Sequence, residues 1–368
     1  MGEQERYLHT EHLAVGYEKP LIKEIELSVN RGEILTLIGP NGAGKSTILK
    51  TITRQLSPHR GVIWIDKSSL KDLTGNQVAK KMAVVMTKRV QPELMTCEDV
   101  VATGRYPYTG RFGVLGEKDR EKVWQALRMV QAEALAEVSF DKISDGQRQR
   151  IMLAKAICQE PEVIVLDEPT SYLDIKHKIE LLYILKHMVQ QKKIAVIMSL
   201  HELELAERIS DKVVCVGNGK IQCCGTVEEI FEGDYITKLY GIEKGSFYDK
   251  FGTVELWKAE GEPKVFIIGG GGSGIALYRR LQRKGIPFVA GVLNENDVEY
   301  EVAKALGRVV AEKPFEEISE ESYLKAVAWI EKCDTVVCTV TEFGTMNKKN
   351  EKLLLLAKEQ GKVVADIV

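Results

Sequence analysis

The sequence has little of what would place the chain inside a membrane. Its longest apolar runs, such as Val163–Leu166 and Leu353–Ala357, are far shorter than the ~20 residues that a membrane-spanning helix needs. The segment Met1–Glu11 is polar and charged, so we expect no signal peptide there. If the protein serves a membrane, we expect it to do so through a partner.

The sequence also lacks an excess of charge and a paired cysteine pattern. The formal net charge is -2, which gives no electrostatic reason to expect nucleic acid as a partner. The 7 cysteines are odd in number and scattered, as is typical of reduced thiols rather than of a disulfide framework. The adjacent Cys223 and Cys224 have no second pair at zinc-site spacing, so we interpret them as a strand-end pair.

The hydrophobic pattern predicts two α/β domains. A length of 368 residues favours more than one domain, and short apolar β-branched runs follow helical segments, as in parallel sheets. The composition shifts near Gly241–Pro263, and a new strand begins at Val265. We therefore expect one domain at residues 1–255, with a helical region at about 90–160, and a second domain at residues 256–368.

A glycine-rich loop lies between a predicted strand, Ile34–Ile38, and a predicted helix, Thr47–Ile52. Its sequence fits G-x-x-x-x-G-K-[ST], a phosphate-binding pattern in which backbone N–H groups and the helix N-terminus face the phosphates. Lys45 can reach the β- and γ-phosphates, and the Ser46 hydroxyl can ligate Mg²⁺. We expect ATP contacts from these loop residues: Gly39, Asn41, Gly42, Ala43, Gly44, Lys45, Ser46 and Thr47.

Two carboxylates follow the apolar strand at Val163–Leu166. In α/β proteins, ligands lie at the carboxyl ends of the strands, where Asp167 and Glu168 are expected. We predict that Asp167 holds Mg²⁺, directly or through water, and that Glu168 is the general base for the attacking water. Together with the phosphate loop, the pair indicates a P-loop NTPase.

Three further segments, in chain order, resemble motifs of the ABC ATPase family. Ile143–Arg150 resembles the signature motif, usually written LSGGQ, although Asp145 replaces its first glycine. Ser171–Asp174 resembles the D-loop, and Ser199–Glu202 resembles the switch-histidine region. The resemblance implies a P-loop NTPase domain with a helical subdomain that works as a homodimer. It also implies that each nucleotide is contacted by one subunit and by Ser144, Gly146 and Gln147 of the other, and that the D-loop, with Asp174 as a further nucleotide contact, crosses the dimer interface.

The resemblance assigns three more roles. His201 would contact the γ-phosphate and hold Glu168 and the water in place, which makes Lys45, Glu168 and His201 the expected catalytic set. Tyr17 lies where the family has an aromatic ring that stacks on adenine. The family's Mg²⁺-contacting glutamine is replaced by Thr87, whose shorter side chain would need a bridging water.

The segment Met95–Tyr108 resembles a stretch of the importer ATPases for iron–siderophore, haem and cobalamin. In that family this region joins the helical subdomain and faces the permease, and we interpret Arg105 and its neighbouring aromatics as an element that receives a partner's helix. Ordinary packing within the subdomain is the alternative. The sequence does not decide between an iron chelate and a corrinoid.

The second domain carries a further glycine pattern after the strand Val265–Ile268. The residues Gly269–Gly274 fit G-x-G-x-x-G ahead of the predicted helix Ile275–Lys284, and Glu295 follows at a spacing that suits an acid on a ribose. We therefore expect a small Rossmann-like α/β domain. Its loop either binds a nucleotide or another phosphate ligand, or is a tight turn in a domain used for regulation or dimer contact.

The combined expectation is the ATP-hydrolysing, Mg²⁺-dependent motor of an importer for an iron chelate, haem or cobalamin. Such a subunit would lie at the cytoplasmic face of the membrane, bound to permease subunits and acting indirectly with a substrate-binding protein. The alternative is a non-transport ABC ATPase regulated by its C-terminal domain.

Overall fold

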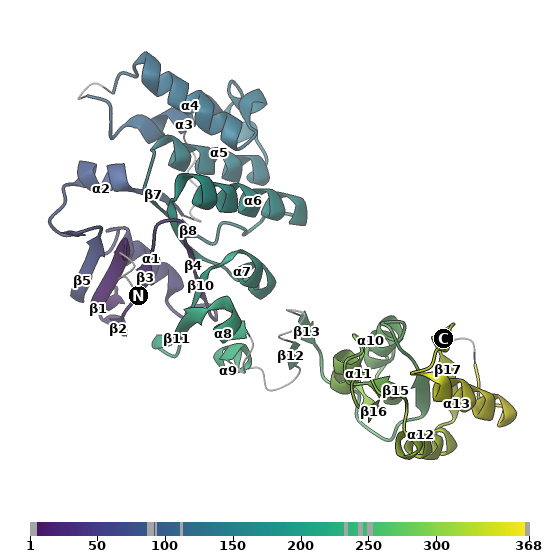
Figure 1. The fold of residues 1–368 in the computed structure, drawn as a ribbon. Helices are drawn as coiled ribbons and strands as arrows, with labels where there is room; N and C mark the ends of the chain where they lie inside the picture. Colours follow the sequence, from purple (N-terminus) through teal and green to yellow (C-terminus); the bar gives the residue numbers. More distant parts are fainter. Residues whose placement is uncertain are drawn as a thin grey trace. The chain divides into compact units, whose positions relative to one another are not determined.

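The chain divides into two compact units, Met1–Tyr240 and Gly241–Val368, each with its own core (Figure 1). The computed structural model describes residues 6–86, 92, 94–110, 113–231, 235–241, 246–248 and 253–364. Within these residues, no helix combines the length and the hydropathy that a membrane span requires.

The first unit contains two sheets. A smaller, antiparallel sheet has the order β2 (Pro20–Ile25), β1 (Leu8–Gly16), β5 (Arg60–Ile65) and β6 (Ser68–Ser69), with β3 (Ser28–Val29) paired to β1. The central sheet has the order β11 (Lys220–Thr226), β10 (Lys212–Gly217), β4 (Ile34–Ile38), β9 (Ala195–Ser199), β8 (Val163–Asp167) and β7 (Met82–Val85).

The central sheet is parallel except for its edge strand β11. Every residue of β4, β8 and β9 is buried, as expected for strands covered on both faces. Parallel strands end at the same edge of a sheet, so the segments after β4, β8 and β9 meet there.

Helices cover this sheet and form a separate group at one end of the unit. The helices are α1 (Lys45–Ile52), α2 (Gly75–Lys81), α3 (Cys97–Ala102), α4 (Glu117–Met129), α5 (Asp145–Cys158), α6 (Ile175–Lys192), α7 (Leu203–Ile209), α8 (Val227–Phe231) and α9 (Tyr235–Tyr240). Short 3₁₀ turns lie at Thr103–Arg105, Glu133–Leu135 and Phe140–Lys142. Figure 1 shows α3, α4 and α5 gathered together, away from β1, β2 and β5.

Arg105 ties this helical group together instead of facing a partner. It is buried, and its guanidinium donates to Asp119 Oδ1 (3.0 Å), to the carbonyl oxygen of Cys158 (2.7 Å) and to Glu160 Oε2 (2.9 Å). The same group stacks on the Tyr108 ring, 4.1 Å from its centroid. The interpretation of Arg105 as a receiver of a partner's helix is therefore wrong, whereas the neighbouring aromatics Tyr106 (60% exposed) and Tyr108 (38% exposed) do reach solvent.

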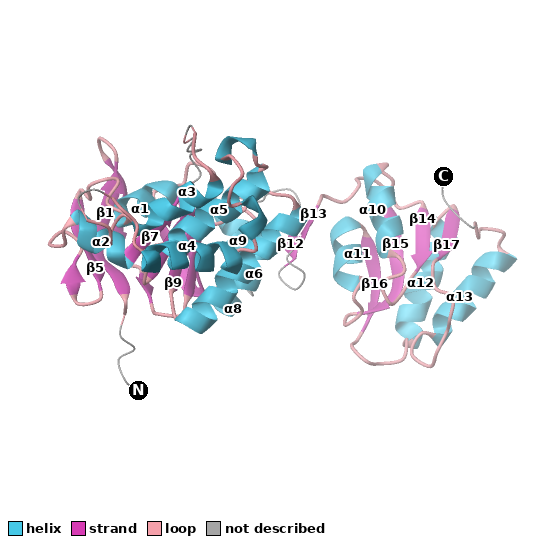
Figure 2. Ribbon diagram, turned by 90° about the horizontal axis from the view of Figure 1, so that it is seen from above, coloured by secondary structure: helices cyan, strands magenta, loops and turns pink. Residues whose placement is uncertain are grey.

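The second unit is an open, four-stranded parallel sheet between two pairs of helices (Figure 2). Its strands have the order β16 (Arg308–Glu312), β15 (Phe288–Asn294), β14 (Val265–Ile268) and β17 (Thr335–Cys338). This is the order 3-2-1-4 with which doubly wound dinucleotide-binding sheets begin. Its helices are α10 (Ile275–Arg283), α11 (Tyr300–Leu306), α12 (Glu320–Lys332) and α13 (Lys348–Glu359).

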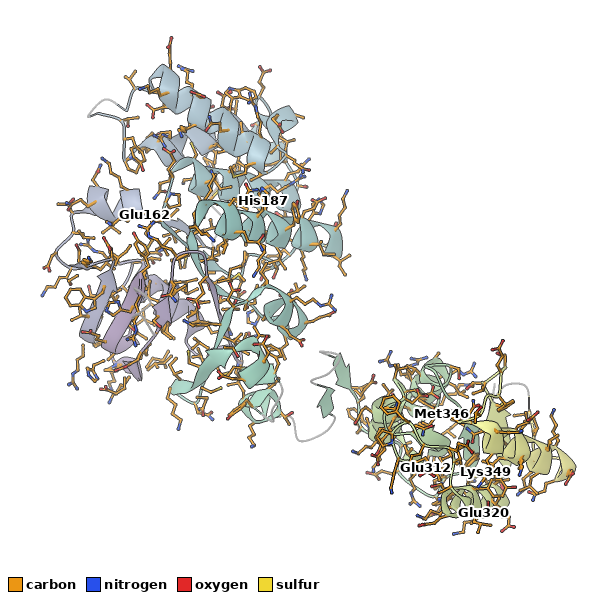
Figure 3. The ribbon with its side chains drawn as sticks, in the orientation of Figure 1. Glu162, His187, Glu312, Glu320, Met346 and Lys349 are labelled. Atoms are coloured by element: carbon orange, nitrogen blue, oxygen red, sulfur yellow. The ribbon has the colours of Figure 1, made fainter. Side chains whose placement is uncertain are left out.

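Alternating residues of β14 supply the two cores of this unit. Val265 and Ile267 pack with α10 and α11, whereas Phe266 and Ile268 pack with α12 and α13. An ion pair between Lys349 of α13 and Glu320 of α12, 2.8 Å from Nζ to Oε2, joins the second pair of helices (Figure 3).

The boundary between the units lies earlier than the expected division at residues 255 and 256. A short hairpin of β12 (Ser246–Tyr248) and β13 (Thr253–Glu255) belongs to the second unit. The reason is visible at Glu255, which is buried and pairs with the Arg279 guanidinium of α10.

The Arg105 contacts generate a stability prediction. Replacing Arg105 with Ala removes charge-assisted hydrogen bonds to two carboxylates and a carbonyl, which we expect to lower the local opening free energy of α3–α5 by about 2–3 kcal/mol. Hydrogen–deuterium exchange of peptides from residues 97–129 measures this opening.

The exposed Arg208, which pairs with Glu204 one helical turn away, is the control: its Ala variant should change the opening free energy of α7 by less than about 0.5 kcal/mol. Equal effects from the two variants would contradict the role given to Arg105.

Candidate active site

The candidate site lies at the carboxyl edge of the central sheet. The phosphate loop follows β4, the acid pair ends β8, and His201 follows β9. Since β9 lies between β4 and β8, three segments that are distant in sequence converge on one edge.

The phosphate loop has the backbone that its glycines allow. Gly39, Gly42 and Gly44 have φ of 145°, 77° and 105°, values that side-chain-bearing residues rarely adopt. The Lys45 ammonium donates to the carbonyl oxygens of Gly39 (2.6 Å) and Pro40 (3.1 Å), so it lies back across the loop. Burial lowers the pKa of Lys45, while Glu168 and Asp167 oppose that shift.

A chain of hydrogen bonds links the loop to the acid pair. Ser46 Oγ donates to Asp167 Oδ1 (3.0 Å), and Ser199 Oγ donates to the same oxygen (2.8 Å). The Ser199 hydroxyl also accepts from the Glu168 backbone N–H (3.0 Å). Ser199, whose motif position carries no expected role of its own, is therefore the bridge between the Asp167 carboxylate and the Glu168 backbone.

The Glu168 carboxylate is held from both sides. Its Oε1 lies within hydrogen-bond distance of His201 Nε2, and its Oε2 accepts from Ser171 Oγ (3.2 Å). Glu168 has a φ of 49°, in the left-handed region that costs a non-glycine residue energy. Such strain at a carboxylate contacted by a histidine is typical of a functional position.

The oxygen set suits Mg²⁺. Ser46 and Asp167 offer a hydroxyl and a carboxylate oxygen 3.0 Å apart, and hard cations such as Mg²⁺ prefer oxygen ligands of these types. Thr87, the third expected contact, lies outside the described residues.

Tyr17 is placed at the end of β1 as an exposed ring. It is 62% exposed, and its hydroxyl accepts from the Lys50 ammonium of α1 (3.1 Å). This contact ties the ring to the last turn of α1, the helix that follows the phosphate loop.

The signature residues form the N-terminus of α5. Ser144 and Gln147 make a capping box: the Gln147 N–H donates to Ser144 Oγ (3.2 Å), and the Ser144 N–H donates to Gln147 Oε1 (2.9 Å). Gly146 packs so closely on α6 that an added Cβ would lie 2.9 Å from the His177 ring. Asp145 pairs with Arg148 (3.4 Å), which offsets its charge beside the helix N-terminus.

Asp174 caps the following helix, α6. Its Oδ1 accepts from the His177 backbone N–H (2.9 Å) and lies 2.8 Å from His177 Nδ1. The His177 N–H is the main reason why the pKa of Asp174 is lowered. His177 thus connects Asp174 to Gly146, a link between the D-loop and the signature helix that no sequence motif indicates.

One more residue contacts the loop from far along the chain. The Gly39 N–H donates to the Tyr240 hydroxyl of α9 (3.0 Å). The sequence contains no pattern that would have identified Tyr240.

The second glycine loop does not have the geometry of a phosphate site. The Gly271 N–H donates to Asp297 Oδ2 (2.8 Å), and the Gly274 N–H donates to Glu299 Oε2 (2.6 Å). A phosphate would have to displace one carboxylate and lie beside the other. The hypothesis of a phosphate ligand at Gly269–Gly274 is therefore not supported, and Asp297, rather than the expected Glu295, is the acid at this loop.

Glu299 is fully buried beneath that loop, next to the Tyr278 ring. Burial raises the pKa of Glu299 to about 7, and burial also raises the pKa of Tyr278. An added Cβ on Gly274 would lie 2.5 Å from the Tyr278 hydroxyl, so this glycine is required by the close packing below the loop.

Sequence comparisons match both units to known families. The profile of the family described as ABC transporter matches residues 22–171, and that of the MJ0874 family matches residues 288–367. The chain is 45% identical, over 78% of its length and 99% of the relative's, to an ABC transporter ATP-binding protein of Methanocaldococcus jannaschii. It is 34% identical to the iron(3+)-hydroxamate import ATP-binding protein of Bacillus subtilis, over 64% of this chain and 88% of that protein.

Solved structures give the same assignment for the first unit. A transporter assigned to the metal-chelate type, in an inward-facing conformation, matches at a TM-score of 0.58 and 25% identity, covering 68% of this chain and 96% of that chain. A dimeric bacterial ABC transporter cassette matches at a TM-score of 0.54 and 25% identity, covering 60% of this chain and 98% of that chain. With its phosphate loop, acid pair and signature helix in this fold, the chain belongs to the family of ABC transporter ATP-binding proteins.

Proposed function

We propose that this ATPase is the motor subunit of an importer, and that Glu168 and His201 form its hydrolytic pair. The observation that carries the proposal is the hydrogen-bonded chain from Ser46 through Asp167 and Ser199 to the backbone of Glu168, whose carboxylate contacts His201. These hydrogen bonds hold Glu168 and His201 at the carboxyl edge of the sheet, where the phosphate loop begins after β4.

Each residue of this chain has a distinct task. Glu168 accepts the proton of the attacking water, and His201 and Ser171 orient its carboxylate. Lys45 exchanges its two loop carbonyls for phosphate oxygens, which is favourable because the ammonium is partly buried and charge-assisted bonds are stronger there. Ser46 and Asp167 would hold Mg²⁺, which neutralises charge on the β- and γ-phosphates.

A second copy of the chain completes the site. Ser144, Gly146 and Gln147 present the N-terminus of α5, whose partial positive charge favours a phosphate. Asp174 and His177 link that helix end to the D-loop, so the two segments can close on the partner's nucleotide as one body. The likeness to a dimeric cassette supports this arrangement.

The substrate of import is proposed to be a metal chelate or a corrinoid. The support is the likeness to a transporter assigned to the metal-chelate type and to an iron(3+)-hydroxamate import protein. In this proposal the protein lies at the cytoplasmic face of the membrane and engages a permease through its helical group. There, Tyr106 is available for contact.

The role of Glu168 gives the first test. Glu168→Gln keeps the shape and the contact with His201 but removes the base, so we expect ATP turnover to fall by about 10²–10⁴-fold. ATP binding should persist, and an ATP-stabilised dimer should accumulate, as followed by light scattering.

The exposed Glu204 of α7 supplies the matched control, because Glu204→Gln makes the same chemical change at a carboxylate that pairs with Arg208 and not with the residues of the site. Its turnover should stay at the wild-type value. If Glu168→Gln hydrolyses ATP as fast as Glu204→Gln, then Glu168 is not the base.

The second test concerns Tyr17, whose ring is proposed to stack on the adenine of ATP. Removing the ring in Tyr17→Ala should weaken ATP binding by about 5–10-fold, since stacking of one aromatic ring contributes roughly 1 kcal/mol. Tyr17→Phe should bind as the wild type does. Titration with a fluorescent ATP analogue measures both, with Tyr183→Ala as the control because Tyr183 is similarly exposed on α6. An unchanged dissociation constant for Tyr17→Ala would refute stacking.

Transport itself is tested in vesicles that contain the chain with its co-purified permease. We expect ATP-dependent uptake of a ferric chelate or a cobalamin, abolished by Glu168→Gln. Uptake confined to sugars or amino acids would contradict the substrate class, and ribosomes in place of a membrane partner would favour a non-transport ATPase.

A further inference from the structure

The second unit contains a cavity of about 370 Å³ at the carboxyl ends of its strands. The glycine loop follows β14, Asn294 ends β15, and Val340 and Glu342 follow β17. The chain winds from β14 toward β15 and β16, then crosses to β17 on the other side. The cavity therefore lies at the switch point where ligands bind in open α/β sheets, and its volume suits a small molecule.

Several hydrogen-bond donors around this cavity are already in use. The N–H groups of Gly271 and Gly274 donate to Asp297 and Glu299. Asn294 Nδ2 donates to the carbonyl oxygens of Lys313 and Glu316, both at 2.8 Å. The Asn350 side chain bonds to the backbone of Val292, since its Oδ1 accepts from the N–H and its Nδ2 donates to the carbonyl oxygen, both at 3.0 Å.

The polar side chains of the lining offer a ligand mainly acceptor oxygens. An asparagine whose amide nitrogen is bonded elsewhere presents its carbonyl oxygen, so Asn294 acts here as an acceptor. Asp297 and Glu342 add two carboxylates, and neither lysine nor arginine is among the described residues of the lining. Asn296 is the exception, because its Oδ1 accepts from the Phe315 N–H (3.2 Å) and its Nδ2 remains a donor.

The lining also contains apolar side chains, together with Asn347, whose Oδ1 accepts from the Gly344 N–H (2.7 Å) and whose Nδ2 donates to the Glu342 carbonyl oxygen (3.4 Å). Val292, Val340 and Met346 line the cavity beside the carboxylates, and Met346 is labelled in Figure 3. Thus the lining offers both negative charge, which attracts a cation, and apolar surface, which accepts hydrocarbon. A metal ion does not fit this set, since the described residues contain no cluster of three or more His, Cys, Asp or Glu side chains that could hold one.

We propose that this cavity binds a small organic cation, an ammonium group on an apolar body, with Asp297 and Glu342 as its charge partners. The site belongs to the second unit alone and does not depend on the hydrolytic function of the first. The proposed ligand is a cation, whereas the glycine pattern of the sequence suggests an anionic phosphate ligand.

Three probe molecules with the same hydrocarbon chain and a positive, neutral or negative head group test the proposal. Pentylammonium, pentanol and pentanoate share a hydrocarbon chain and differ in the head group. Met346 is the sole methionine of residues 241–368, so in the full chain its labelled methyl group is a local NMR reporter, assigned with Met346→Leu. We expect pentylammonium alone to shift the Met346 signal in a saturable manner.

The variants Asp297→Asn and Glu342→Gln should each weaken pentylammonium binding by about tenfold, because each removes a charge-assisted hydrogen bond. Glu295→Gln is the matched control: it removes an equal charge nearby, on a residue outside the lining, and should leave the dissociation constant unchanged. Equal weakening by all three variants would mean non-specific attraction and would overturn the proposal. A Met346 shift caused by pentanoate or by NAD⁺ would also overturn the proposal. The same holds if pentanol binds as tightly as pentylammonium.

Discussion

The direct pairing of Asp167 with Ser199 in the parallel ladder of β8 and β9 is the constraint on which the ATPase site depends. This register places one hydroxyl between the two acids, where it donates to Asp167 and accepts from the Glu168 backbone. A one-residue slip of β9 would turn that side chain to the opposite face. The fully buried strands on either side make such a slip costly, so the core of the sheet sets the geometry of the chemistry.

Most of the fold could be predicted from the sequence because local patterns dominate it. Apolar β-branched runs mark β4, β8, β9 and β14, and the two glycine loops appear where a strand passes into a helix. The fold class was confirmed by the likeness to ABC cassettes. The unit boundary was harder to predict, because the position of β13 depends on Glu255 reaching Arg279, a contact that no local pattern encodes.

The remaining features are products of long-range contacts. Arg105 lies in a motif-like stretch, yet its partners at positions 119, 158 and 160 bury it. The second glycine loop matches a dinucleotide pattern in spacing, but that pattern describes only the backbone, and Asp297 and Glu299 decide what the loop's N–H groups bind. Sequence spacing therefore identifies a loop more reliably than it identifies the charge of the ligand.

The contact between Tyr240 and Gly39 brings the end of the first unit to its nucleotide site. Tyr240 is the last residue of the first unit, and its hydroxyl accepts from the first N–H of the phosphate loop. The residue that ends the first unit therefore also holds the start of the nucleotide loop. A truncation that removes Tyr240 together with the second unit would take away a hydrogen bond of the ATP site as well.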